Sequence, residues 1–491
     1  MFLGIDLGTS GLKAIVLDRA HEVRASASAP LSVQQPQALW REQDPAAWWK
    51  ACELALDDVL AQAAQAGIAP GSIEAIGLTG QMHGATCLDA RGDVLRPAIL
   101  WNDGRAHAEC AELEARVPDS RRIAGNLMMP GFTAPKLLWL ARHEPQVFAQ
   151  LAMVLLPKDY LRWQLTGDFA SDVSDAAGTL WLDVGKRDWS NELLAATGLS
   201  RAQMPRLYEG TEITGSLRAD VAQRFGLRTI PVVAGASDNA AGALGVGVVR
   251  AGQAMLSLGT SGVCFVAADS FAANPAQAVH SFCHALPQTW HLMSVMLSAA
   301  SCLDFTARLT GASDVDALLY EAGQQGLRED TPLFLPYLNG ERTPHNNPAA
   351  QAVFFGMHAA TVRADLANAT LEGVGHGLTQ GIAALEAAGT QINSISLIGG
   401  GARSAYWSQM LADISGKTLL RRAQAEVGPS LGAARLAWIA CDRASAAEIC
   451  IAPALVQAHE PVAARHRMHG DRGLRFAQLY RQVAPMFPAI A

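Results

Sequence analysis

The pentapeptide Leu-Gly-Thr-Ser-Gly occurs twice in this chain, at residues 7–11 and again at residues 258–262. Each copy lies between two short apolar runs, which predicts a tight hairpin whose turn is made of glycine and hydroxyl residues. Such a turn can bring backbone N–H groups and hydroxyls close to an anion, because glycine has no Cβ in the way. Two copies half a chain apart predict two related domains, each offering a phosphate-binding turn to a shared site.

An aspartate, Asp6, lies directly before the first of these turns. A carboxylate beside a phosphate-binding turn is electrostatically unfavourable unless a cation lies between them, which favours Mg²⁺ held mainly through water. The alternative is an aspartate that caps its own turn, which is an ordinary role for this residue type.

A second candidate carboxylate, Asp238, follows the apolar stretch 230–234 and is followed by Asn239 and the small residues 240–243. An aspartate at the start of a helix is most often an N-cap, which contributes about 1 kcal/mol. The small neighbours also leave room for a ligand, and a carboxylate there can accept a proton from an alcohol that attacks a phosphoryl group. The local sequence leaves both roles open.

Two glycine-rich segments have different settings. Residues 399–401 are three glycines between an apolar strand and a helix, where a bare turn lets the backbone approach a flat ligand or a phosphate. A plain strand-to-helix turn is the alternative. Gly373, Gly375 and Gly377 lie inside a helical stretch and do not follow a strand, which predicts helix packing and not a nucleotide loop. The chain also has no Gly-x-x-x-x-Gly-Lys-Ser/Thr run, which argues against a P-loop enzyme.

Polar and aromatic residues suited to a polyol gather in a third region. Met82 and His83 follow the apolar run 73–78, and Trp101 begins a polar segment shortly afterwards. Polar side chains can hydrogen-bond hydroxyl groups, while a tryptophan offers a flat apolar face to the C–H side. A lone histidine is more often structural, so the sequence alone leaves the role of His83 open.

The bulk properties limit the class of protein. The chain has 491 residues and 50% hydrophobic content, enough for two cores. Its net charge is -7, without a basic block, which argues against nucleic acid as a partner. No apolar run approaches the ~18 residues of a membrane span, and the N-terminus does not read as a signal peptide. The eight cysteines are scattered without a Cys-x-x-Cys pair, so we expect free thiols and a cytoplasmic protein.

The apolar pattern predicts strands that alternate with helices, which argues for an α/β fold with mixed sheets. The predicted strands are residues 2–7, 12–18, 22–28, 73–78, 230–234 and 394–398, together with the hairpin around Gly259. The predicted helices begin at Asp44 and Asp238, or cover about 365–387 and 404–414.

Together these motifs resemble the FGGY family of carbohydrate kinases, in the superfamily that includes actin, hexokinase and heat-shock chaperone ATPases. The resemblance covers nearly the whole chain, and the matching segments occur in the family's order. They are the first phosphate motif at 5–10, the signature segment 131–139, the second phosphate motif at 258–262, a second signature at 354–356 with 365–373, and the adenosine motif at 398–403.

The resemblance implies two ribonuclease H-like (actin-like ATPase) α/β domains with mixed sheets around a central interdomain cleft, which closes by a hinge. Residues 1–247 would form the N-terminal, sugar-binding domain with the first phosphate motif, and residues 248–491 the C-terminal, ATP-binding domain. Asp238 would be the general base, and Asp6 would lie near Mg²⁺, bound through water. The resemblance places Thr9, Ser10, Lys13, Gly259, Thr260, Gly400 and Gly401 around ATP, and Met82, His83, Trp101 and Asn239 around the sugar.

Within the family, four segments most resemble the members that act on D-xylulose: 81–86, 101–105, 125–132 and 340–346. Members that act on glycerol carry an Arg-Glu pair where this chain has Met82 and His83. The resemblance therefore implies ATP-dependent phosphorylation of D-xylulose to D-xylulose 5-phosphate, and it suggests a homodimer.

Two alternatives remain: an FGGY kinase for another ketose or polyol, such as ribulose or glycerol, or a non-catalytic sugar- or ATP-binding regulator on the same scaffold. An intact Asp238 beside intact phosphate turns argues against the regulator, since a pure binder has no need of a base. The segment after about Cys441 is too poorly patterned for a role to be assigned.

Overall fold

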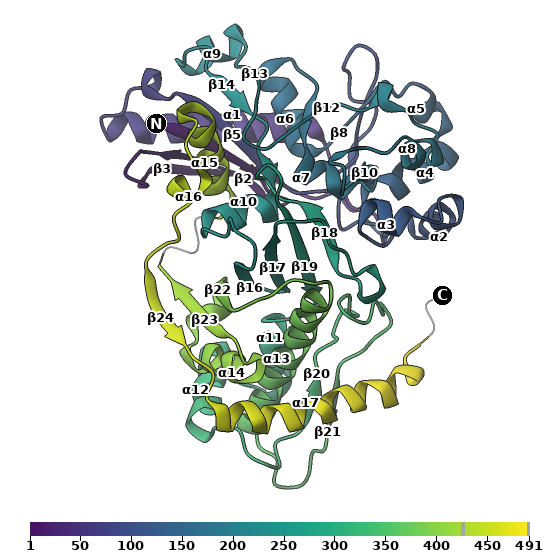
Figure 1. Ribbon diagram of the computed structural model, residues 1–491, viewed down its shortest axis with the longest axis vertical. Coiled ribbons are helices and arrows are strands. Elements are labelled where there is room, and N and C mark those ends of the chain that lie inside the picture. The colour runs from purple at the N-terminus through teal and green to yellow at the C-terminus, as the bar shows by residue number, and fades with distance from the viewer. Residues whose placement is uncertain (424–427, 489–491) are drawn as a thin grey trace.

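The computed structural model describes residues 1–423 and 428–488, and it consists of two α/β halves that lie one above the other in Figure 1. Each half is built on a seven-stranded sheet. The first sheet has the order β13 (Ile213–Ser216), β14 (Pro231–Val233), β5 (Ala75–Gly80), β1 (Phe2–Leu7), β2 (Gly11–Leu17), β3 (Val23–Pro30), with β15 (Ala236–Ser237) also paired to β5. The second has the order β18 (His280–Cys283), β19 (Trp290–Met296), β17 (Gly262–Ala268), β16 (Ala254–Leu258), β22 (Ser394–Ile398), β23 (Thr418–Arg422), β24 (Leu455–His459).

The two sheets share one pairing pattern. In the first, β3–β2 and β2–β1 are antiparallel, β1–β5 and β5–β14 are parallel, and β14–β13 is antiparallel. In the second, the same sequence of pairings runs through β19, β17, β16, β22, β23 and β24. The repeated pentapeptide forms the turn of the corresponding hairpin in each sheet, β1–β2 and β16–β17. The prediction of two related α/β halves with mixed sheets is therefore confirmed.

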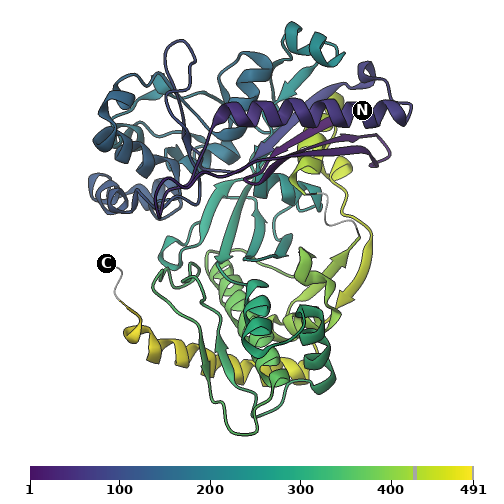
Figure 2. The same cartoon turned by 180° about the vertical axis from the view of Figure 1, so that it is seen from behind.

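Most of the predicted helices form where expected. The helix α1 (Pro45–Gln65) begins after its N-cap Asp44, whose side chain accepts a hydrogen bond from the N–H of Ala46, and Figure 2 shows it lying across the outer side of the first half. The strand expected at 73–78 begins at Ala75 instead, because Pro70–Ser72 forms a short 3-10 turn just before it.

In the second half, α13 (Arg363–Ala387) and α14 (Ala405–Ser415) cover the sheet. The glycine triplet lies inside α13, as predicted. A Cβ on Gly373 would meet the carbonyl oxygen of Phe334 at 2.2 Å, and one on Gly375 would meet Ile414 at 2.4 Å. These glycines therefore let Phe334 and Ile414 pack closely against α13.

The remaining elements connect the sheets and surround them. The remaining helices are α2 (His107–Arg116), α3 (Ser120–Ala124), α4 (Thr133–His143), α5 (Pro145–Ala149), α6 (Pro157–Thr166), α7 (Val173–Ala176), α8 (Asn191–Ala196), α9 (Ala219–Phe225), α10 (Asp238–Gly245), α11 (Ser301–Thr310), α12 (Val315–Gln325) and α16 (Ala446–Ile449). Short strands pair as β4 (Glu42–Gln43) with β7 (Ala98–Ile99), β6 (Thr86–Leu88) with β8 (Met153–Leu155), β9 (Ala170–Asp172) with β12 (Arg206–Tyr208), β10 (Leu182–Asp183) with β11 (Asp188–Trp189), and β20 (Leu333–Leu335) with β21 (Val353–Phe355).

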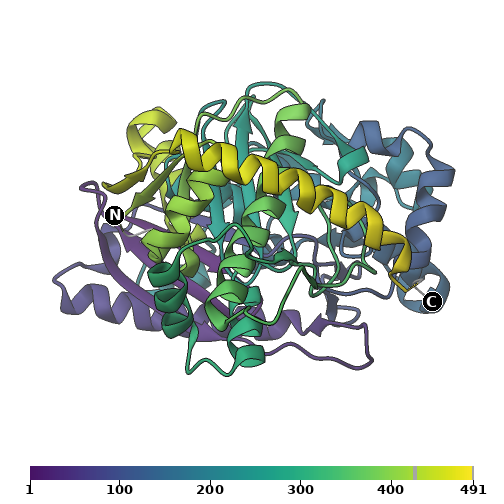
Figure 3. The ribbon, with the colours of Figure 1, turned by 90° about the horizontal axis from the view of Figure 1, so that it is seen from below.

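The last part of the chain joins the two halves. The helix α15 (Pro429–Asp442) packs on β1 and β5 of the first sheet, and Figure 1 shows it among the purple strands near the N-terminus. Close approach requires glycine in those strands, since a Cβ on Gly4 would meet the Ser430 carbonyl oxygen at 2.1 Å and one on Gly77 would meet that of Ala433 at 1.8 Å. The chain then returns to the second half. Figure 3, a view from below, shows α17 (Ala463–Val483) crossing the face that is turned toward the viewer.

Two expectations from composition can be compared with this fold. All eight cysteines are free thiols, as predicted. Of the helices in the described part of the chain, none combines the length and the apolar character that a membrane crossing needs.

Candidate active site

Three cavities lie at the boundary between the halves and in the second half. The small cavity has a volume of about 200 Å³ and draws its walls from both halves. The middle cavity, of about 240 Å³, lies between α10, α15 and the β16–β17 hairpin. The large cavity, of about 750 Å³, lies in the second half between the β16–β17 turn, α12 and the segment 400–407.

Predicted site residues from distant parts of the sequence meet in these cavities. Those that line the small cavity are Met82, His83, Trp101, Asp238 and Asn239. Those that line the large cavity are Gly259, Thr260, Gly400 and Gly401. Asp238 and Asn239 also line the middle cavity, so the carboxylate of Asp238 lies in the wall shared by the small and middle cavities.

Asp238 is the first residue of α10, and Ser237 occupies the N-cap position. Its Oδ1 accepts hydrogen bonds from the backbone N–H of Asn239 at 2.7 Å and from the Asn239 side-chain amide at 2.9 Å. Burial raises the pKa of the Asp238 carboxyl to about 6, although the Asn239 hydrogen bonds oppose this rise. A carboxylate with such a pKa is still ionised at neutral pH and is a stronger base than a free aspartate.

Asp6 lies close enough to Asp238 for their charges to interact. Burial raises the pKa of Asp6 to about 7, the negative charge of Asp238 adds to the rise, and Lys13 opposes it from the facing position on β2. Two partly buried carboxylates whose charges repel fit a divalent cation held nearby, since the cation would stabilise both.

The first glycine-hydroxyl turn is tied to the small cavity through Thr9. Its hydroxyl donates to the side-chain oxygen of Gln81 at 2.8 Å and accepts from the indole N–H of Trp101 at 2.9 Å. Ser10 lies exposed at the tip of the turn, where its carbonyl accepts from the N–H of Leu31 at 2.9 Å. The hydrogen bonds of Thr9 therefore couple the first turn to the tryptophan of the small cavity.

His83 is held in a left-handed backbone conformation, with φ of 69°. Its carbonyl oxygen accepts from the hydroxyl of Thr133 and from Nζ of Lys136, both at 3.0 Å and both from α4. The ring Nδ1 lies 2.6 Å from the carbonyl oxygen of Gly178, which only accepts, so Nδ1 carries the hydrogen and Nε2 is an acceptor. Burial lowers the pKa of His83 to about 3, so the ring is neutral.

The sequence predicts wall residues of the small cavity in the first half alone, and it singles out neither Phe132 of that half nor the residues that the second half contributes. The missed wall residues are Phe132, Ser261, Val263, His280, Phe282, Met293, Val295 and Arg342. Phe132 and Arg342 belong to segments that carry the family resemblance. His280 and Phe282 alternate along β18, and this two-residue period was the available signal that both face the same side.

The large cavity depends on the bare backbone of the glycine turn at 399–401. A Cβ on Gly401 would meet the ring of Trp407 at 2.6 Å and the Cβ of Leu258 at 3.0 Å. We expect Gly401→Ala to raise the KM for ATP roughly tenfold, because overpacking costs about 1–3 kcal/mol at the wall of the cavity. Steady-state kinetics with varied ATP measures this.

Gly470→Ala is the matched control, since nothing lies within 4 Å of a Cβ at that position on α17. We expect this control to leave the KM for ATP unchanged. An unchanged KM for ATP in Gly401→Ala would contradict a role of this turn in nucleotide binding.

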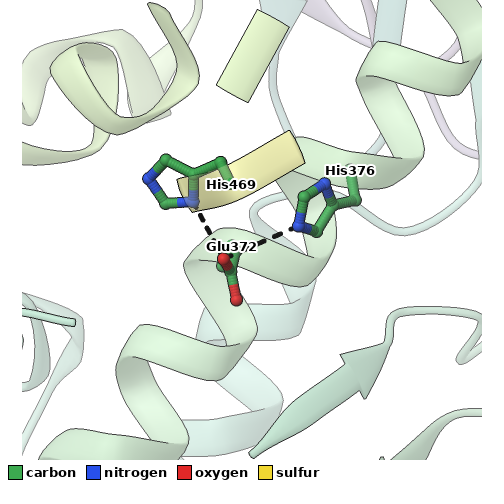
Figure 4. Close-up of side chains that lie close together, drawn as sticks. All are labelled: Glu372, His376 and His469. Carbon is green, nitrogen blue, oxygen red and sulfur yellow. Dashed lines mark hydrogen bonds and ion pairs between the residues drawn. The ribbon is translucent and has the colours of Figure 1, made fainter. Parts of the chain in front are cut away.

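A buried cluster of Glu372, His376 and His469 lies on α13 and α17, outside the three cavities (Figure 4). The carboxylate and the two imidazoles bring ligand-type atoms within 4.8 Å of one another. However, Arg472 donates to both oxygens of Glu372 at 2.7–2.8 Å, and His469 Nδ1 lies 2.8 Å from Oε1. Because the guanidinium already occupies the carboxylate, we interpret the cluster as an ion-pair network that fixes α17 to α13.

Comparisons with known proteins agree with this geometry. The family model described as "FGGY family of carbohydrate kinases, N-terminal domain" matches residues 1–245, and the corresponding C-terminal domain matches residues 254–441. A xylulose kinase of Escherichia coli is 58% identical over 487 residues, covering 99% of this chain and 100% of the relative. One from Klebsiella pneumoniae is 53% identical with the same coverage. A crystal structure described as a "xyloylose kinase" from Brucella ovis superposes with a TM-score of 0.95 at 46% identity, covering 99% of each chain.

Proposed function

Because this chain belongs to the FGGY family of carbohydrate kinases, we propose that it transfers the γ-phosphoryl group of ATP to the C5 hydroxyl of D-xylulose. The products are ADP and D-xylulose 5-phosphate. The observation that carries this proposal is the position of Asp238 in the wall shared by the small and middle cavities. Similarity to xylulose kinases over the full chain length supports D-xylulose as the acceptor.

In the proposed reaction the sugar occupies the small cavity with its C5 hydroxyl facing Asp238. The adenosine part of ATP occupies the large cavity, and the phosphates extend toward the middle cavity between the two glycine-hydroxyl turns. Asp238 accepts the proton as the C5 oxygen attacks the γ-phosphorus, the bond to the bridging oxygen breaks, and ADP leaves. Such a transfer needs mainly positioning and neutralisation of charge.

We assign charge neutralisation at the phosphates to Lys13 and to backbone N–H groups of the two turns, with Asp6 holding Mg²⁺ through water. Bound Mg²⁺ would neutralise phosphate charge, its usual contribution to phosphoryl transfer. The mutual repulsion of Asp6 and Asp238 supports a cation at this position.

Closure of the two halves over the cleft completes the proposal, since closure excludes water that would otherwise accept the phosphoryl group. The small cavity supports this, because its walls come from both halves. X-ray scattering should show a narrower interdomain angle after D-xylulose is added, and profiles that do not change would contradict closure.

The activity is tested by a coupled assay of ADP release with ATP alone, with ATP and D-xylulose, and with ATP and other pentuloses. We expect ADP release to depend on sugar and to be fastest with D-xylulose. If ATP and sugars bind without any ADP release, the chain is a regulator on the kinase scaffold and the proposal is wrong.

The raised pKa of Asp238 predicts the pH dependence of the reaction. The base acts as a carboxylate, so kcat/KM should fall about tenfold per pH unit below pH about 6 and level off above it. A free aspartate would place this midpoint near about 3.9. Direct detection of the phosphorylated product from about pH 4.5 to about pH 8 avoids the loss of activity that coupling enzymes would suffer at low pH. If the midpoint of the kcat/KM profile lay near the pKa of a free aspartate, Asp238 with its raised pKa would not be the base.

Three further points remain proposals. We place the domain boundary near residues 247 and 248, which the matched family segments 1–245 and 254–441 support. We propose a homodimer, which light scattering on the purified chain would test. We propose the cytoplasm as the compartment, since eight free thiols suit a reducing environment.

A further inference from the structure

Arg342 contributes a guanidinium to the wall of the small cavity. It lies in the connection between β20 and β21. In the described ranges 1–423 and 428–488, no carboxylate forms a salt bridge with its guanidinium, and its side-chain contact is Nη1 to Nε2 of His280 at 3.5 Å. The neighbouring Glu341 is directed elsewhere, since its Oε1 accepts from the backbone N–H of Arg342 at 2.7 Å and of Leu297 at 3.4 Å. The guanidinium therefore has donors available for a ligand.

His280 orients this guanidinium, and Asn126 orients His280. The Asn126 amide donates to the carbonyl oxygens of Ala124 at 2.9 Å and Ser281 at 2.8 Å, so its oxygen faces Nδ1 of His280 at 2.9 Å. Nδ1 of His280 consequently carries the hydrogen, and Nε2 presents its lone pair to Arg342. The donors of Arg342 are thus held in a defined direction.

The loop that carries Arg342 is itself fixed to the second sheet. The hydroxyl of Thr343 donates to the carbonyl oxygen of Ala278 at 2.9 Å and accepts from the N–H of Val295 at 3.1 Å. A group placed by such fixed contacts loses little freedom on binding a ligand, which favours a binding role.

Arg342 and Asp238 both line the small cavity, and each has its own hydrogen-bond partner. Asp238 contacts Asn239, whereas Arg342 contacts His280, and its positive charge adds to the burial that lowers the pKa of His280 and of His83. Since both residues line this cavity, a sugar with its C5 hydroxyl at Asp238 can present its C1–C2 end to Arg342.

The chemistry of the substrate defines what arrives at that end. In a cyclic pentulose the C5 oxygen closes the ring on C2, so it is not free to attack a phosphoryl group. The reacting form is the open chain, whose C2 is a free carbonyl. A carbonyl oxygen only accepts hydrogen bonds, and Arg342 offers it a charged donor, whereas Phe132 and Phe282 of the same wall are apolar and Nε2 of His83 is an acceptor.

We propose that Arg342 donates hydrogen bonds to the C2 carbonyl oxygen of the open-chain ketose and thereby selects a ketose over the corresponding pentitol. The inference rests on the proposed sugar kinase function. Without Arg342 the carbonyl oxygen would lose a charged donor that replaces the hydrogen bonds it made in water. The C2 hydroxyl of a pentitol could still donate to Nε2 of His83, so its binding depends less on Arg342.

The test compares D-xylulose with xylitol and D-arabitol, the two pentitols formed by reducing C2. For wild type, Arg342→Met and Arg342→Lys, kcat/KM is measured for D-xylulose and the inhibition constant for each pentitol. We expect Arg342→Met to lower kcat/KM for D-xylulose roughly 10- to 100-fold, as loss of a hydrogen bond to a charged group does. The pentitol constants should change by less than about threefold, on the same principle. Arg342→Lys keeps a charged donor and should recover part of the loss.

Arg228→Met is the control, because Arg228 is an exposed arginine whose Nη2 donates to the carbonyl of Ile73 and which does not line the small cavity. It should leave all of these constants unchanged. Equal weakening of D-xylulose and both pentitols in Arg342→Met, or no effect on D-xylulose, would overturn the inference. Failure of the wild-type protein to phosphorylate D-xylulose would instead refute the proposed function, so the two failures are distinguishable.

Discussion

Asp238→Asn is expected to lower kcat for D-xylulose phosphorylation roughly 10²- to 10⁴-fold, the usual contribution of a positioned general base. The amide keeps the size of the side chain and an oxygen that can accept from Asn239, but it cannot take the proton from the C5 hydroxyl. Because the carboxylate lies in the wall between the small and middle cavities, its removal affects the transferring group and leaves the large cavity intact. ATP should therefore bind the variant with an affinity within about threefold of wild type, since no nucleotide contact is lost.

Single-turnover phosphorylation and calorimetric titration with ATP measure the two quantities separately. Asp220→Asn is the matched control, since Asp220 is an exposed aspartate on α9, paired with Arg218 and distant from the three cavities. It should retain wild-type kcat. Full activity in Asp238→Asn would show that another group accepts the proton.

Glu372→Gln is expected to cause a large loss of stability without touching the site. The change leaves Arg472 buried without its counter-charge, and breaking a buried ion pair in this way costs about 3–5 kcal/mol. Burial alone would raise the pKa of Glu372, but the nearby imidazole of His376 and the hydrogen bonds from His469 and Arg472 outweigh it and hold the pKa well below its usual range. The stabilisation is therefore fully present at neutral pH and is lost only as the pH falls through that lowered value.

Urea unfolding at about pH 7 measures the difference in the free energy of unfolding between Glu372→Gln and wild type. The carboxylate of Glu372 is ionised at this pH. Glu192→Gln, at an exposed position on α8, is the control and should stay within about 0.5 kcal/mol of wild type. If the free energy of unfolding of Glu372→Gln lies within about 1 kcal/mol of the wild-type value, the network does not fix α17 to α13 as we interpret it.

The features that the sequence predicts well are local ones. The two hairpins and the start of α1 at Asp44 depend on turn and cap chemistry within a few residues. The return of α15 to the first sheet has no such local signal. Gly4 and Gly77 are needed because a helix more than 350 residues away lies on them, and in the sequence they are ordinary glycines in apolar strands.

The same distinction holds for the candidate site. Asp6, Asp238 and the glycine turns stand out by their neighbours in the sequence, and the family resemblance gives them roles. The contribution of β18 and of Arg342 depends on how the second sheet meets the first half, which no local pattern reports. Burial raises the pKa of both Asp6 and Asp238, and the charge of Asp238 adds to the rise at Asp6; these effects exist only in the folded chain.

The central claim is that this site phosphorylates D-xylulose in preference to other acceptors. A competition assay tests it most directly, with equimolar D-xylulose, D-ribulose and glycerol, limiting ATP and Mg²⁺, and identification of the phosphorylated products by NMR. The account predicts that D-xylulose 5-phosphate is the main product. A larger share of ribulose phosphate or glycerol phosphate would contradict it.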